Sequence, residues 1–328
     1  MKAVRVFAFI LLAVVASWTQ EMGKEELPVT PAIRDLPARE APKFPFTTHS
    51  QTIRRNVDVV LVPVTVTDSK DRVVTGLEKE HFAVYEGPVR QEIRYFLSED
   101  TPISLGIVLD ASGSMADKFD KAREALAQFF NTANAEDEFF LVAVADRPQL
   151  ISDFTRSIED IQNKLLFTEP KGQTALVDTI FLALNKAKQG RYEKRALLVI
   201  SDGGDNHSRY SQRELKEFAQ EADTQVYAIG IHDNPRTPAE RLGPLLLAEI
   251  AEATGGRAFT VNHASELPDI AAKIGLELRS QYVLGYHPTN PKHDNKWHKI
   301  KVKLIPPNGV SRSRLRVYAK TRYYAPAE

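Results

Sequence analysis

Short apolar segments alternate with amphipathic segments along the middle of the chain. The apolar segments are expected to form buried strands at 103–110, 138–145, 195–202, 225–231 and 257–261. In the amphipathic segments, apolar residues recur three and four positions apart, which predicts helices at 118–131, 157–166, 174–189, 211–222, 244–253 and 265–279. Strands that alternate with helices in this way predict a mostly parallel sheet covered by helices on both faces.

A second pattern stands on either side of this region. Short segments that alternate or are bounded by turn residues predict β-strands at 57–67, 81–87, 91–97, 282–286, 297–305 and 315–320. Three strands alone make a thin and marginal sheet. We therefore expect the N-terminal strands (53–100) and the C-terminal strands (282–328) to pack as one antiparallel β-sandwich, into which the α/β domain (101–281) is inserted.

The N-terminus has the pattern of an export signal. Lys2 and Arg5 precede an apolar run at 6–16, and polar residues follow at 19–21. This pattern predicts a secretory signal peptide over 1–22, because the run is shorter than the roughly twenty residues of a membrane span. An uncleaved membrane anchor is the alternative. Residues 23–52 predict a Pro-rich linker, and no later segment predicts a membrane span, so a periplasmic or secreted protein is expected.

Composition narrows the classes of function. The 328 residues include 43 basic and 43 acidic side chains, a balance that does not favour a nucleic-acid partner. The chain contains no cysteine, which excludes disulfides, thiolate metal sites and cysteine nucleophiles.

Five oxygen-bearing side chains stand where strands give way to loops and helices. Asp110 and Asp202 each end a predicted buried strand, Ser112 and Ser114 follow the first of them, and Thr174 begins a predicted helix. Ligands of an open α/β sheet bind at the carboxyl ends of its strands, so we expect one surface to gather all five. Two carboxylates and three hydroxyls suit a hard cation, with Mg²⁺ favoured and Mn²⁺ or Ca²⁺ as alternatives.

These residues resemble the metal-ion-dependent adhesion site of the von Willebrand factor type A domain. That family carries Asp-x-Ser-x-Ser after its first strand, a Thr in a later loop and an Asp after a central strand; the positions here are Asp110, Ser112, Ser114, Thr174 and Asp202. The resemblance covers residues 101 to about 281 and implies a doubly wound, Rossmann-like sheet. It also implies a divalent cation that the serines and the threonine touch directly, while the aspartates act through water. The flanking segments 61–66, 82–86 and 282–286 look like bacterial exported proteins related to this family, whose activities are poorly characterised.

The resulting functional prediction is an exported, non-enzymatic adhesion or scaffolding module that binds an Asp or Glu carboxylate of a partner protein through the cation. One alternative is a hydrolase that uses the same cation to activate water. In sequence, His207 is the only nearby candidate base and no Gly-x-Ser-x-Gly motif is present. The other alternative is an envelope protein whose metal is purely structural.

Two weaker signals favour ordinary explanations. Asp205 and His207 are expected to be solvated loop residues beside the predicted metal site. The irregular spacing of His287, His293 and His298 matches no zinc pattern, so scattered surface histidines are expected.

Overall fold

The computed structural model describes residues 59–98, 100–232, 237–289, 294–305 and 314–325. All of them belong to one unit of the chain, Arg55–Glu328. The predicted signal peptide and linker lie outside the described residues, as does His293. Within the described ranges, no helix is both long and apolar enough to cross a membrane.

A six-stranded sheet with the strand order β10-β9-β8-β5-β6-β7 forms the centre of the α/β domain. Its strands are β5 (Ser104–Asp110), β6 (Glu138–Val144), β7 (Gln149–Thr155), β8 (Arg195–Ser201), β9 (Gln225–Ile231) and β10 (Ala258–Val261). The strands from β10 to β6 are parallel, whereas β7 pairs antiparallel with β6 at one edge. The sequence pattern did not predict β7, because this strand lacks a continuous apolar run and buries only Ser152.

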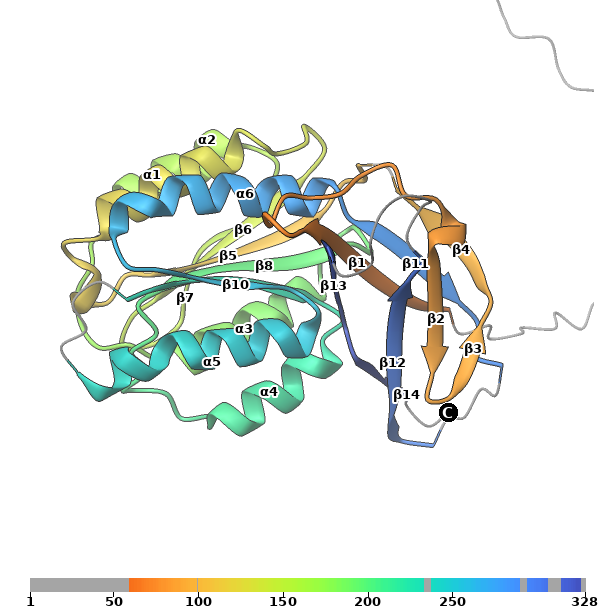
Figure 1. Cartoon of the computed structure of the whole chain (residues 1–328). Helices are drawn as coiled ribbons and strands as arrows, with labels where there is room; N and C mark the ends of the chain where they lie inside the picture. The colour runs from red at the N-terminus through yellow and green to blue at the C-terminus, as the bar shows by residue number, and fades with distance from the viewer. Residues whose placement is uncertain (1–58, 99, 233–236, 290–293, 306–313, 326–328) are drawn as a thin grey trace, which may run out of the picture. The chain divides into compact units, whose positions relative to one another are not determined.

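Helices cover both faces of this sheet (Figure 1). One face packs against α1 (Phe119–Phe130), α2 (Ile158–Leu166) and α6 (Leu267–Arg279). The other packs against α3 (Leu176–Ala187), α4 (Gln212–Glu221) and α5 (Pro238–Thr254). Side chains of β5 point alternately to the two faces of the sheet. Leu105 and Ile107 pack in the core beneath α1, α2 and α6, and Val108 packs in the core beneath α3, α4 and α5. The predicted doubly wound α/β fold is confirmed.

Helix α5 begins six residues before its predicted start. The Thr237 side chain accepts a hydrogen bond from the Glu240 main-chain N–H (3.2 Å), and Pro238 occupies the first helical turn. Both are favourable at a helix N-terminus. Pro244, which was predicted to begin the helix, lies inside it.

Two four-stranded antiparallel sheets lie beside the α/β domain, in the orders β13-β1-β11-β4 and β14-β12-β2-β3. Their strands are β1 (Val60–Asp68), β2 (Phe82–Glu86), β3 (Val89–Gln91), β4 (Ile93–Leu97), β11 (Tyr282–Tyr286), β12 (Lys296–Leu304), β13 (Leu315–Ala319) and β14 (Arg322–Ala325). Short 3-10 helices occur at Lys79–His81, Gly113–Met115 and Ala264–Glu266. Each sheet combines strands from before and after the α/β domain, because β1 pairs with β11 and β12 pairs with β2. Both sheets contribute to one buried cluster.

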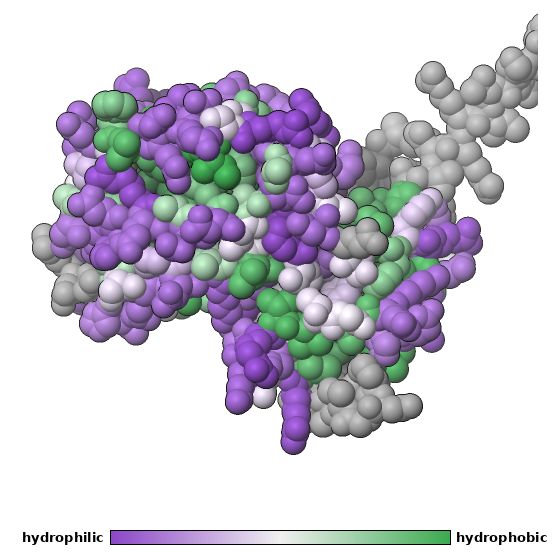
Figure 2. Space-filling view, turned by 90° about the horizontal axis from the view of Figure 1, so that it is seen from above, coloured by the Kyte–Doolittle hydropathy of each residue, from purple (hydrophilic) through white to green (hydrophobic). Residues whose placement is uncertain are grey.

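The surface differs between these two regions. Seen from the side of α1, α2 and α6, the α/β domain is mainly hydrophilic, and hydrophobic residues are more visible over the antiparallel sheets (Figure 2).

His298 on β12 lies between Glu86 and Asp294, at 2.9 and 3.0 Å. His298 is therefore held by one carboxylate on β2 and by another just before β12.

Candidate metal centre

The first part of the site is the loop that follows β5. Asp110 ends a strand that is buried along its whole length, and its own side chain is fully buried. The Ser112 main-chain N–H donates to Asp110 Oδ1 (2.9 Å), which turns the chain back toward the strand end. This turn brings the hydroxyl oxygens of Ser112 and Ser114 within 3.1 Å of each other. Three of the five predicted residues thus form one local group.

The second part follows β8, the strand beside β5. Ser201 Oγ donates to Asp110 Oδ2 and accepts a hydrogen bond from the Gly203 N–H (2.8 Å). Asp202 is buried, and its Oδ1 accepts a hydrogen bond from the Gly204 N–H (3.3 Å). Because β5 and β8 are the strands on either side of the point where strand order reverses, these carboxylates stand where open α/β sheets bind ligands.

Thr174 lies in the loop between α2 and α3 and is almost completely buried. Its N–H donates to Asn206 Oδ1 (3.0 Å), and its carbonyl oxygen accepts from the N–H groups of Asn206 and His207. The same loop reaches the first part of the site, since the Lys171 N–H donates to the Ala111 carbonyl (2.8 Å). The structure therefore joins all three loops through main-chain hydrogen bonds. These contacts of Thr174 are made by its main chain, whereas the two serine hydroxyls contact each other directly.

The electrostatics of the site are those of two buried carboxylates close together. Burial, and next the charge of Asp202, raise the pKa of Asp110 to about 6. Lys118 supplies a counter-charge: its Nζ lies 3.5 Å from Asp202 Oδ2 and donates to the Ser114 carbonyl (3.2 Å). One ammonium against two carboxylates leaves a net negative charge when both are ionised.

This donor set fits a hard divalent cation, because it offers oxygen atoms alone and an uncompensated negative charge. Within the described ranges, no cluster of three or more His, Cys, Asp or Glu side chains could hold a metal. A site here would therefore depend on hydroxyls beside its two carboxylates. Asp110, Ser112, Ser114, Thr174 and Asp202 as metal ligands remain a prediction.

Two residues at the site were not predicted from the sequence, and Asp205 is less exposed than expected. Ser201 and Lys118 both contact a predicted ligand carboxylate, but the sequence pattern placed them only in a strand and at a helix start. Asp205 was expected to be solvated. The residue is partly exposed, but its Oδ1 is buried without a hydrogen-bond partner among the described residues, and burial raises the pKa of its carboxyl group. The neighbouring His207 is exposed, as expected for a loop residue.

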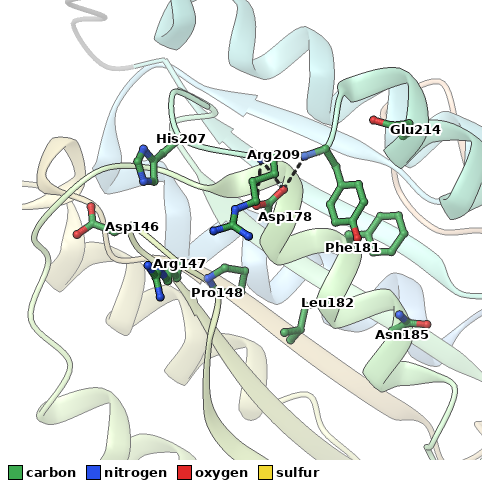
Figure 3. Close-up of a pocket in the computed structure, with 11 residues that line it drawn as sticks. Asp146, Arg147, Pro148, Asp178, Phe181, Leu182, Asn185, His207, Arg209 and Glu214 are labelled. Carbon is green, nitrogen blue, oxygen red and sulfur yellow. Dashed lines mark hydrogen bonds between the residues drawn. The ribbon is translucent and has the colours of Figure 1, made fainter.

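A pocket of about 800 Å³ adjoins the Thr174 loop (Figure 3). Its walls are the loop after β6 at 146–148, the face of α3 that carries Asp178 and Phe181, and the loop at 207–210. The Phe181 ring stacks on Tyr210 with 4.4 Å between centroids. Two hydrogen bonds connect the pocket to the site. The His207 N–H donates to the Thr174 carbonyl, and the Gln173 N–H, next to Thr174, donates to the Asp146 side chain.

The pocket combines satisfied carboxylates with unpaired guanidinium groups. Asp178 accepts hydrogen bonds from the Arg209 and Tyr210 N–H groups, both at 3.0 Å. In Figure 3, the Arg147 and Arg209 side chains lie at the same end of the pocket as His207. Neither guanidinium forms an ion pair with the part of the chain that the structure describes.

Part of the α/β domain is similar to a known protein family. Residues 105–204 match the family model of the von Willebrand factor type A domain. An uncharacterized protein of Borreliella burgdorferi is 27% identical over 181 residues, which are 48% of this chain and 53% of the relative, so the match spans about half of that protein's length.

Two solved structures are similar to this chain at low sequence identity. The conserved hypothetical protein BatB from Bacteroides thetaiotaomicron is 22% identical, and the match covers 54% of this chain and 100% of that chain with a TM-score of 0.44. A von Willebrand factor type A protein from Catenulispora acidiphila is 11% identical and covers 84% and 75% of the two chains with a TM-score of 0.48. Residues 105–204 match that family model, and the six-stranded sheet with its helices has a von Willebrand factor type A-like α/β fold.

Proposed function

We propose that this domain is a metal-dependent protein-binding module. Domains of this type typically mediate protein–protein interaction or adhesion. The residues proposed to hold the cation, with Mg²⁺ favoured over Mn²⁺ and Ca²⁺, are Asp110, Ser112, Ser114, Thr174 and Asp202. The observation that carries the proposal is the convergence of two buried carboxylates and a pair of hydroxyls at the point where strand order reverses.

The partner is proposed to offer an Asp or Glu side chain. Two carboxylates and neutral hydroxyls would leave a bound divalent ion roughly balanced, so an open coordination position would favour an anionic oxygen from outside. The neighbouring pocket supports a protein partner, because beside the site it adds a stacked aromatic wall and two guanidinium groups that form no ion pair with the described residues. The N-terminal pattern further supports a location in the bacterial envelope or outside the cell.

We propose binding rather than hydrolysis because both carboxylates are engaged by the protein itself. Asp110 accepts hydrogen bonds from the Ser112 N–H and from Ser201, and Asp202 accepts one from the Gly204 N–H. Groups held in this way serve to organise the site, whereas a general base must reach the proton it removes.

The proposal is tested by capturing partners from a bacterial envelope extract, with Mg²⁺ and with EDTA. The variant is Thr174→Ala, and the matched control is Thr168→Ala in the same loop, whose hydroxyl donates to the Lys164 carbonyl at the end of α2. Wild type and control should capture the same proteins with Mg²⁺ and release them in EDTA, and Thr174→Ala should capture them in neither condition. Identical capture under every condition would contradict the proposal. Ester or phosphoester hydrolysis abolished by Thr174→Ala would instead favour the hydrolase.

A further inference from the structure

Lys118 holds an unusual position for a lysine. It is the N-cap residue of α1, where Ser, Thr, Asp or Asn is ordinarily favoured. The N-terminal end of a helix also carries partial positive charge, which disfavours a cation there. Nevertheless, the Lys118 side chain is only 9% exposed. A residue that breaks local rules while remaining buried points to a functional role.

The Lys118 side chain points toward the proposed metal site. Instead of extending into solvent, Lys118 turns back over the preceding loop, where its Nζ donates to the Ser114 carbonyl at 3.2 Å and lies 3.5 Å from Asp202 Oδ2. The ammonium therefore stands beside residues proposed to hold the divalent cation. It supplies there the kind of charge that the cation would also supply.

The geometry of the pair is loose for a purely structural ion pair. Elsewhere in the chain, Arg257 binds both oxygens of Asp71 at 2.8 and 3.0 Å. The single 3.5 Å contact between Lys118 and Asp202 is at the limit of hydrogen-bonding distance, and the ammonium is shared with a main-chain carbonyl. Lysine also has a flexible four-carbon stem, which allows its charge to move away.

We propose that Lys118 is a tethered cation that neutralises Asp202 when the divalent ion is not bound and competes with that ion for the site. This inference rests on the proposed metal-binding function. The tethered charge stabilises the metal-free fold, because it offsets one of two buried carboxylates that would otherwise repel each other. It also lowers the affinity for the divalent ion, since binding requires the ammonium to withdraw or to tolerate a like charge.

The test is calorimetric titration of the full chain with Mn²⁺, combined with thermal unfolding in EDTA. Lys118→Met removes the charge while keeping a long, unbranched side chain. Lys118→Gln is also neutral and carries the same expectation if the Met variant does not fold. The matched control is Lys121→Met, which alters an exposed lysine of the same helix that pairs with Glu124.

Both neutral variants at position 118 should bind Mn²⁺ at least tenfold more tightly than wild type. They should also unfold at a lower temperature than wild type in EDTA, and added Mn²⁺ should raise their unfolding temperature by more than it raises that of wild type. Lys121→Met should match wild type in both Mn²⁺ affinity and unfolding temperature. Unchanged or weaker Mn²⁺ binding by the position-118 variants, with binding by wild type intact, overturns the tethered cation alone. If neither wild type nor any variant binds Mn²⁺, both this inference and the proposed function are overturned.

Discussion

At the scale of single residues, the main feature of the site is a pair of carboxylates that are buried close to each other. Asp110 and Asp202 are both buried, and the charge of Asp202 adds to burial in raising the pKa of Asp110 to about 6. Such an arrangement is unfavourable for a structural pair and is typical of functional sites. Lys118 offsets part of the charge, and a divalent cation would offset the remainder.

Spacing along the chain predicted Asp110, Ser112 and Ser114 as one group, because a loop after a buried strand must place them together. Ser201 and Lys118 could not be predicted as part of the site, since their roles depend on side-chain direction. Ser201 reaches across to Asp110 from the neighbouring strand, and Lys118 bends back over its own loop. Periodicity gives the face on which a residue lies, but not such contacts across loops.

Gly203 provides a prediction at this scale. Its φ is +77°, and a Cβ there would lie 2.4 Å from the Gly243 Cα. Gly203→Ala should therefore lower the free energy of unfolding by at least about 2 kcal/mol, measured by urea denaturation. Gly76→Ala is the matched control, because Gly76 has the same φ but open space around its Cβ position, and it should cost only about 1 kcal/mol. An equal decrease in the free energy of unfolding for both variants would show that the close approach of Gly203 to Gly243 does not matter for stability.

At the scale of elements, long periodic segments were predictable and exposed edges were not. The buried strands β5, β8 and β9 are continuous apolar runs, and their predicted bounds agree closely with the structure. In contrast, β7 and β14 pair only at sheet edges, where fewer side chains are buried and the apolar signal is weak.

Helix α6 is tied to the antiparallel sheets by a buried charge cluster. Glu277 on α6 is fully buried and pairs with Arg257, which also binds Asp71 in the loop after β1. Burial raises the pKa of Glu277 to about 7, although Arg257 and Lys273 oppose the shift. Because the folded pKa exceeds the ordinary value near 4.5, the contribution of Glu277 to stability is present at low pH and is lost as pH rises through about 7.

Glu277→Gln should therefore become more stable relative to wild type as pH increases. The difference in free energy of unfolding between variant and wild type is expected to grow by more than about 1 kcal/mol from pH 5 to pH 8 in urea titrations. Glu124→Gln, which replaces an exposed carboxylate paired with Lys121, is the control for the chemistry of the substitution. A difference for Glu277→Gln that does not change with pH would refute the raised pKa of Glu277.

At the scale of the whole described structure, the sandwich and the α/β domain share a buried polar junction. Tyr227 Oη lies 3.2 Å from Thr65 Oγ1 on β1 and accepts a hydrogen bond from Gln281 (3.0 Å), just before β11. Each antiparallel sheet also needs strands from both sides of the α/β domain. The sequence predicted this fold class, because neither set of flanking strands could form a stable sheet alone.

The two regions should consequently unfold in one transition. In a Trp18→Phe background, the fluorescence of Trp297 on β12 and far-ultraviolet circular dichroism should give the same urea midpoint. Tyr227→Phe should shift both midpoints together, corresponding to a loss of about 1 kcal/mol. Separate midpoints for the two signals would show that the sandwich and the α/β domain are independent.

The central claim is that the convergent oxygen atoms hold a divalent cation, and Mn²⁺ binding followed by electron paramagnetic resonance tests it most directly. Wild type should bind one Mn²⁺ that Mg²⁺ displaces. Replacing both Ser112 and Ser114 with Ala should weaken binding at least tenfold, because this change removes two oxygen donors and leaves both carboxylates in place. Wild-type protein that binds no Mn²⁺, or a double variant that binds it as tightly as wild type, would contradict the account.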